Sequence, residues 1–246
     1  MKKGAGHMEK EFISPFSYVQ HEWKLDWEIV PSNKKYDRPN ENRSEREQTA
    51  LEAISAVGCI GGLQLKYLFG INKPRLKRMR EKHLVVRHTL SREGREIPIY
   101  TIGKYGANKI MPEYEDNYWL KMDTLQVLKC LSFFQFCSVL DDPKIIPAPE
   151  PFTAGVYLKG IDDHPFYVYV ARDGIKDLLL YLKWKENFIE RIFVIAENLE
   201  YLRGLEVFME SDRPLKLRVI LDEDLKKREF RLYHYDKSNL KKWIHS

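Results

Sequence analysis

Cysteine is scarce in this chain of 246 residues, which holds only Cys59, Cys130 and Cys137 and no CxxC pair. So small and odd a number argues against a disulfide framework and against a cysteine-based metal site. Cys130 and Cys137 lie seven residues apart, on one face of an expected helix, and we expect both to be small core residues. This cysteine usage favours a reducing cytoplasm.

Long hydrophobic runs are also absent. No segment reaches the roughly 18 to 20 apolar residues that a membrane-spanning helix needs, and the opening MKKGAGHM has no apolar stretch typical of a signal peptide. The triplet Gly6-His7-Met8 is typical of a cloning remnant, so we expect residues 1–7 to be foreign and the natural protein to begin at Met8.

The common catalytic and nucleotide-binding motifs are missing as well. There is no Walker motif, no GxGxxG, no GxSxG and no HExxH, and the seven histidines are scattered. The acidic run Asp222-Glu223-Asp224 is more typical of a solvated turn than of a metal site. The sequence therefore predicts no catalytic residue, no cofactor and no metal.

Basic residues, by contrast, are concentrated in one segment. Residues 73–104 hold ten basic and three acidic residues, a local net charge of +7, whereas the whole chain carries only +5. The rest of the chain therefore sums to −2, and the positive charge belongs to one region.

Three helices are expected ahead of and within this region. Ser44-Glu45-Arg46-Glu47 is a capping-box signature, and an apolar stripe then runs to Gly58, which ends the first helix. LQLKYLF predicts a second helix with Leu63, Leu65 and Leu68 in the core. A third begins near Asn72 with Pro74 in its first turn, and it buries Leu76, Met79 and His83 on one face.

A hairpin follows the third helix. Leu84–Leu90 and Ile97–Ile102 read as strands joined by a turn over Ser91–Glu96, and residues 104–111 predict a further helix. This order resembles a winged helix-turn-helix. The segments QTALEAI, LQLKYLFG, PRLKRMREKHLV and Tyr100–Gly106 carry the resemblance, and we assign residues 44–113 to this domain.

The resemblance implies a duplex-DNA interface. In a winged helix the third helix enters the major groove and the hairpin tip approaches the backbone. Arginine geometry suits guanine, so Arg75 and Arg78 are candidate base contacts, whereas His88 is expected to be structural. The expected DNA-binding residues are Lys73, Arg75, Lys77, Arg78, Lys82, Arg92 and Arg95, the lysines and the hairpin arginines contacting phosphates. Two alternatives stay open: a merely solvated amphipathic helix and a protein-interaction module.

Residues 1–43 read as an aromatic arm followed by a polar linker. We expect one strand over Trp23–Ile29 and aromatic side chains that pack on a domain or on a second subunit; a stacking platform for single-stranded nucleic acid is the alternative. Residues 114–140 predict a helix that is apolar over most of its circumference and hence buried. We expect a homodimer, formed through the helix at 118–139 or through the arm.

The second half, residues 114–246, predicts a mixed α/β domain. After the proline-rich segment 141–151, strands are expected over 154–159, 166–171, 191–196 and 215–221, with helices opening at Asp173-Gly174 and over 198–209. The closing FRLYHY reads as a strand and SNLKKWIH as a helix. The fold class is therefore α+β or α/β, with helices on a mixed sheet.

This order resembles the restriction-endonuclease-like fold, and a winged helix followed by such a half resembles the replication-relaxation family of plasmid and phage proteins. The resemblance covers about residues 44–225. It implies a DNA-binding regulator of transcription or replication on a mobile element.

An active nuclease of that fold needs carboxylates for Mg²⁺ on two neighbouring strands, with a lysine that positions water. The corresponding positions hold Ala154 or Gly155 and Tyr169 or Ala171. We therefore expect the fold without the catalysis. The competing hypothesis is a metal-dependent nuclease with displaced acids, for which Asp162, Asp163 and Asp173 are the candidates.

Overall fold

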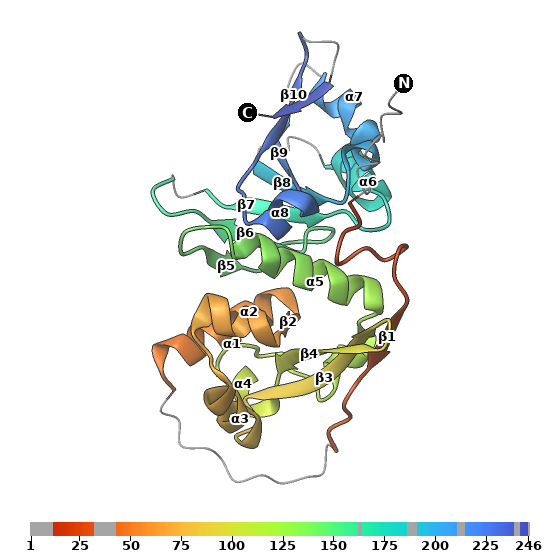
Figure 1. Ribbon diagram of the computed structural model, residues 1–246. Helices are drawn as coiled ribbons and strands as arrows, with labels where there is room; N and C mark the ends of the chain where they lie inside the picture. The colour runs from red at the N-terminus through yellow and green to blue at the C-terminus, as the bar shows by residue number, and fades with distance from the viewer. Residues whose placement is uncertain are drawn as a thin grey trace, which may run out of the picture.

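The computed structural model describes residues 12–31, 43–161, 164–185, 191–210, 215–238 and 242–245. Its strands form two sheets, one with four strands and one with seven, and helices accompany both. In Figure 1 helix α5 (Thr124–Cys137) runs between the two sheets. The protein is thus a mixed α+β protein, as predicted. None of the described helices is long and apolar enough to cross a membrane.

The N-terminal half follows the predicted order of elements. It contains α1 (Glu45–Val57), β2 (Cys59–Gly61), α2 (Gly62–Phe69), α3 (Lys73–Glu81), β3 (Val85–Arg92), β4 (Arg95–Ile102) and α4 (Lys104–Ala107). With β1 (Trp23–Asp26) the strands form an antiparallel sheet in the order β1-β3-β4-β2. Strand β2 was not predicted, because three residues between glycines give no alternating pattern.

The predicted capping box of α1 is confirmed. The Ser44 side chain accepts from the Glu47 N–H, the Glu47 side chain accepts from the Ser44 N–H, and Gly58 ends the helix with φ of 115°. In α2 the prediction holds for Leu65, which is fully buried, but is wrong for Leu63, which is 69% exposed. Residues two apart on a helix point to nearly opposite sides, so both cannot face one core.

Helix α3 begins as its sequence indicates. Asn72 caps it by accepting from the Arg75 N–H at 3.0 Å, Pro74 lies in the first turn, and Leu76 and Met79 are buried. The helix ends at Glu81, and His83 lies beyond it with φ of 51°. The prediction that His83 extends the apolar face of this helix is therefore wrong.

The β3–β4 hairpin is tighter than predicted. Arg92 pairs with Arg95, so only Glu93 and Gly94 form the turn, with φ of 51° and 78°. Two positive φ values match the twist of the flanking strands, which is why such turns favour glycine. Strand β1 of the arm pairs along β3, with Trp23 opposite Arg92.

The expected helix over 114–140 is interrupted. A short 3-10 helix, η1 (Tyr118–Lys121), ends before Asp123, which caps α5 by accepting from the Gln126 N–H at 2.8 Å. A side chain that caps a new helix marks a break in the chain direction, and the apolar periodicity alone did not reveal it.

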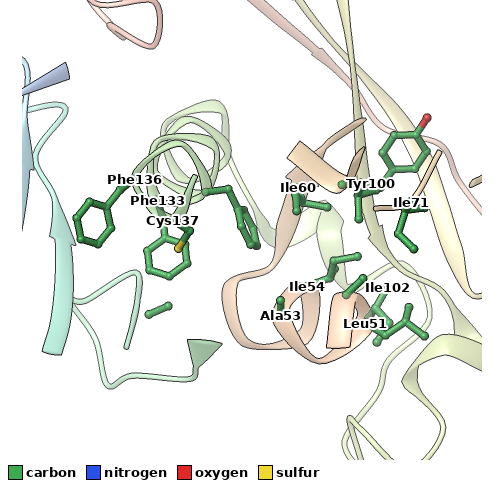
Figure 2. Close-up of a cluster of buried hydrophobic side chains, with 14 of the residues drawn as sticks. Leu51, Ala53, Ile54, Ile60, Ile71, Tyr100, Ile102, Phe133, Phe136 and Cys137 are labelled. Carbon is green, nitrogen blue, oxygen red and sulfur yellow. The ribbon is translucent and has the colours of Figure 1, made fainter. Parts of the chain in front are cut away.

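Helix α5 belongs to a core shared by both halves. Phe133, Phe134, Phe136 and Cys137 join one buried cluster that reaches from α1 to the seven-stranded sheet. Figure 2 shows Phe136 pointing toward a strand of that sheet, with Ile54 and Ile60 on the other side of the helix. Most of α5 therefore faces its own chain, which confirms that the helix is buried, and the homodimer stays a prediction.

The C-terminal half holds the seven-stranded sheet, in the order β11-β10-β9-β8-β7-β6-β5. Its elements are β5 (Lys144–Ile146), β6 (Ala154–Tyr157), β7 (Phe166–Val170), α6 (Lys176–Trp184), β8 (Arg191–Ala196), η2 (Leu199–Leu205), α7 (Glu206–Met209), β9 (Lys216–Leu221), α8 (Asp222–Lys227), β10 (Tyr233–Asp236) and β11 (Lys242–His245). Strands β7, β8 and β9 are parallel and β5, β6 and β7 antiparallel, so the predicted mixed sheet is confirmed.

Two strands of this half were not predicted. The closing SNLKKWIH was expected as a helix, but residues 242–245 form β11, which pairs with β10 over Tyr233–Asp236. The proline-rich segment 141–151, for which no strand was predicted, contains strand β5. In both places the segment is a strand because it pairs with a neighbouring strand, and the local sequence does not show that pairing.

The arm packs against its own chain. Phe16, Trp23 and Trp27 contact the cluster that contains Val127 and Leu128 of α5, and the Trp23 indole donates to Ser17 O at 2.8 Å. The expectation that the arm aromatics pack on a domain is confirmed for these residues. The predicted linker, residues 32–42, lies outside the described residues.

Candidate functional site

A concave site, here called the basic cleft, lies where the start of α1, helix α3 and the segment 104–114 meet. It encloses about 770 Å³. Among the described residues that line it, Glu47 is the one carboxylate. The lining cations are Arg43, Arg75, Arg78, Lys82, Lys104 and Lys109.

Two glycines allow α4 to form one wall of the cleft. A Cβ on Gly106 would lie 2.0 Å from Leu84 O, and one on Gly103 would lie 2.4 Å from His83 O. The Gly103 N–H donates to Leu84 O at 2.9 Å, and the Tyr105 N–H donates to His83 O at 3.2 Å. Backbone therefore touches backbone here, which only glycine permits, and this contact brings Lys104 and Tyr105 beside α3.

Arg43 holds the cleft together from the other side. Its guanidinium donates to Gly106 O and to the Gln48 side chain, both at 3.3 Å, and also to Tyr105 O. Because these acceptors are neutral, none of the described partners of Arg43 compensates its positive charge. Arg43 therefore positions α4 against α1 and contributes a fixed cation to the wall.

The Glu47 carboxylate orients Arg75 and also takes part in the N-terminal cap of α1. The Arg75 Nε lies 3.6 Å from Glu47 Oε1, and the arginine side chain is 30% exposed. Glu47 also accepts the Ser44 N–H in the capping box. The N-terminal cap of α1 and the position of Arg75 are thus coupled through one side chain.

Arg78 and Lys82 carry the cleft's available charge. Both are exposed, and neither forms an ion pair or a side-chain hydrogen bond within the described part of the chain. Lys104 is exposed too, but it lies 3.8 Å from Asp116. Arg75 and Arg78 of α3 and Lys82 at its C-cap follow the i, i+3, i+7 spacing, and all three line the cleft.

The floor of the cleft is apolar and aromatic. Met79 and Leu84 are buried at 1% and 5% exposure, and Tyr105 and Tyr114 also line the site. Burial raises the pKa of the Tyr114 phenol, which therefore stays neutral. The cleft combines a wall of cations with a surface that attracts flat apolar groups.

The other cations predicted on α3 lie elsewhere. Lys77 lines a second, smaller hollow of about 550 Å³ together with Arg80 and Arg87. Its Nζ lies 3.9 Å from Glu81 Oε1. Lys73 is exposed at the start of the helix. The basic charge of α3 is thus divided between two sides.

The hairpin arginines are not part of the cleft. Strands of eight residues place the tip roughly 25 Å from the end of α3, at about 3.3 Å per residue. Figure 1 shows the far end of β3 beside β1. Arg92 donates to Pro15 O at 2.8 Å, and its guanidinium lies 6.0 Å from the Trp23 ring centroid. Arg92 is thus engaged with the arm, whereas Arg95 is exposed, and the phosphate contacts of both stay predictions.

Sequence reasoning also missed part of the cleft. Arg43 was assigned to the linker, Lys104 was counted as charge but not as a site residue, and Lys109 was not considered. Two features of the sequence could have indicated these residues. Arg43 stands just before the capping residue of α1, and the Gly103-x-x-Gly106 spacing is typical of a close contact between two backbone segments.

His88 is structural, as predicted. It is 2% exposed, its Nδ1 accepts the Glu28 N–H at 3.0 Å, and its Nε2 lies 2.8 Å from the Thr101 hydroxyl. Burial lowers the pKa of His88 to about 3, so the ring is neutral at neutral pH. His88 thereby fastens the arm to β3.

A second polar cluster lies at the carboxyl ends of the parallel strands. Arg172, which follows β7, is fully buried, and its guanidinium lies 2.9 Å from Asp222 Oδ1. Asp222 also accepts from the Ser14 hydroxyl of the arm. The prediction that Asp222 to Asp224 form a solvated turn is wrong, since Asp222 and Asp224 are 4% and 3% exposed.

The nuclease positions carry no carboxylates. Ala154, Gly155, Tyr169 and Ala171 are all buried, and Asp173 is exposed. Asp162 and Asp163 lie outside the described residues. Within the described ranges, no three histidine, cysteine, aspartate or glutamate side chains gather in a way that could hold a metal ion.

Comparison with known proteins gives no relative: no family model, curated protein or solved structure matches this chain. The candidate function therefore depends on the geometry and charge of the molecule itself.

Proposed function

We propose that this protein binds DNA through α3 and the basic cleft, as a winged helix-turn-helix protein. The observation that carries the proposal is the pair Arg78 and Lys82, two exposed cations without described ion-pair partners, in a lining with six cations and one carboxylate. Such a surface attracts phosphate groups, which supply most of the affinity in nucleic-acid complexes.

The division of charge on α3 supports a helix that contacts nucleic acid along its exposed side. Lys77 and Arg80 face one hollow, and Arg78 and Lys82 face the other. A helix inserted in a major groove has phosphates on both sides, so cations on both sides suit that placement. The hairpin contributes Arg95 in this proposal, because Arg92 is bound to the arm.

For the C-terminal half we propose a restriction-endonuclease-like scaffold without catalytic activity. The order helix, antiparallel strands, helix and parallel strand supports it, as do the residues without carboxylates at positions 154, 155, 169 and 171. The role that we propose, a cytoplasmic regulator of transcription or replication on a plasmid or phage-like element, follows from the sequence resemblance.

The test is fluorescence anisotropy of a labelled blunt duplex over a series of salt concentrations. We expect Arg78→Ala/Lys82→Ala to weaken binding and to reduce the slope of log K against log salt by about 0.9 for each phosphate that the protein no longer neutralises. Lys176→Ala/Lys185→Ala, at exposed lysines of and beside α6, is the charge-matched control and should leave the slope unchanged. Absence of binding even at low salt would refute the proposal and favour a protein partner.

A further inference from the structure

The shape of the basic cleft is more specific than a flat basic surface. Its volume of about 770 Å³ lies within the roughly 300–1,000 Å³ of small-molecule sites. A duplex presents a broad convex backbone, so its phosphates meet the exposed Arg78 and Lys82 at the rim. They do not enter the space bounded by Arg43 and the half-buried Arg75.

The interior suits a flat ring next to a negative charge. Met79 and Leu84 form a dry floor, and Tyr114 lines the same space. The Tyr114 and Tyr118 ring centroids are 6.0 Å apart at 73°, an edge-on contact rather than a stack. Aromatic rings in this setting bind unpaired bases of any sequence, because every base has a flat face.

We infer that the basic cleft binds an unpaired nucleotide, with its phosphate on Arg78 and Lys82 and its base against Tyr114. This inference rests on the proposed nucleic-acid binding and specifies the chemistry of that site. The nucleotide can come from a single-stranded end beside a duplex or from a free nucleoside monophosphate, because both offer a base and a phosphate.

The experiment compares three labelled DNAs in the anisotropy assay: a blunt duplex, the same duplex with a five-nucleotide overhang, and the overhang strand alone. We expect the overhang to tighten binding by about tenfold, as stacking of one base supports. Binding of the blunt duplex tests the proposed function alone, because this DNA has no unpaired nucleotide. If all three DNAs bound with equal, salt-dependent affinity, this inference would be overturned but the proposed function would not.

Two variants test whether the preference for overhang DNA over the blunt duplex depends on the basic cleft. Tyr114→Leu keeps an apolar side chain but removes the ring. It should abolish most of the overhang preference, measured as the ratio of overhang to blunt-duplex affinity, since stacking needs the ring face. Tyr157→Leu, at a half-buried tyrosine of β6, is the matched control. Equal weakening of blunt and overhang DNA binding in Tyr114→Leu would contradict the inference.

Competition on the wild-type protein distinguishes the sources and does not depend on any variant folding. Displacement of the overhang DNA by adenosine monophosphate, but not by adenosine, would support a free nucleotide. An overhang preference that the monophosphate does not reduce would support a strand end. Displacement by an acidic peptide as effective as that by the monophosphate would overturn the inference, because the cleft would then recognise charge alone.

Discussion

The buried pair Arg172–Asp222 allows a sharp test of what joins the arm to the C-terminal half. Arg172 is 0% and Asp222 4% exposed, and they are linked at 2.9 Å. Arg172 Nε also donates to the Ser132 hydroxyl at 3.2 Å, and Nη1 donates to Ala171 O at 2.9 Å. The Ser14 hydroxyl donates to the other Asp222 oxygen. Helix α5, the ends of β7 and β9 and the arm thus meet around one ion pair.

Asp222→Ala should be strongly destabilising. It leaves the buried guanidinium with neutral hydrogen-bond partners and with Glu197 as the remaining carboxylate that acts on it electrostatically. Breaking one side of a buried ion pair costs about 3–5 kcal/mol in the free energy of unfolding. Removing both charges, as in Arg172→Met/Asp222→Leu, should cost less than Asp222→Ala alone, because no unpaired charge remains buried. If the double variant is more stable than Asp222→Ala, the loss in Asp222→Ala comes from the unpaired charge. If it is less stable, the loss comes from poorer packing.

The assay is urea unfolding followed by tryptophan fluorescence, with the wild type, Asp222→Ala, Arg172→Met, Asp222→Leu and the double variant Arg172→Met/Asp222→Leu measured at one pH. The exposed pair Glu223–Lys227, at 2.7 Å, is the control and should show far weaker coupling. An Asp222→Ala protein as stable as the wild type, or a double variant less stable than Asp222→Ala, would refute this reasoning.

Three further predictions concern other parts of the molecule. The pKa of His88 in the folded protein, about 3, lies below its ordinary value of 6.5, so the unfolded chain binds the proton more readily. The free energy of unfolding should therefore fall by up to about 1.4 kcal/mol per pH unit as the pH drops below 6.5; a His88→Gln variant with the same pH profile in urea unfolding would contradict this. Gly106→Ala places a Cβ against Leu84 O and should lower stability by about 1–3 kcal/mol and weaken DNA binding, whereas Gly160→Ala, at a glycine with open space but φ of 77°, should not weaken DNA binding. Cys59, Cys130 and Cys137 are buried free thiols, so the native protein should not react with a thiol reagent until urea unfolds it; rapid labelling in buffer would show that the core opens.

The elements that could be predicted from the sequence are those with local signals. Ser44 and Glu47 indicate the start of α1, and Asn72 and Pro74 indicate the start of α3. The strand predicted over residues 191–196 has the same bounds as β8. Each depends on contacts within a few residues or on a simple apolar pattern, which a sequence displays directly.

The elements that could not be predicted depend on distant partners. Residues 242–245 form a strand because β10 pairs with them, and Asp222 is buried because Arg172, fifty residues earlier, neutralises it. The same division holds for the site. Arg75, Arg78 and Lys82 follow from helical spacing, whereas Arg43 joins the cleft through carbonyls of α4, which lies some sixty residues later in the chain.

The central claim is that DNA occupies the basic cleft and the exposed side of α3, and lysine footprinting tests it most directly. The protein is acetylated briefly with and without saturating duplex carrying an overhang, and the modified lysines are quantified by mass spectrometry. We predict that DNA protects Lys82 and Lys104, and Lys77 as well, while Lys176 and Lys185 remain reactive. Protection confined to the lysines of the C-terminal half, with Lys82 and Lys104 unchanged, would contradict the claim.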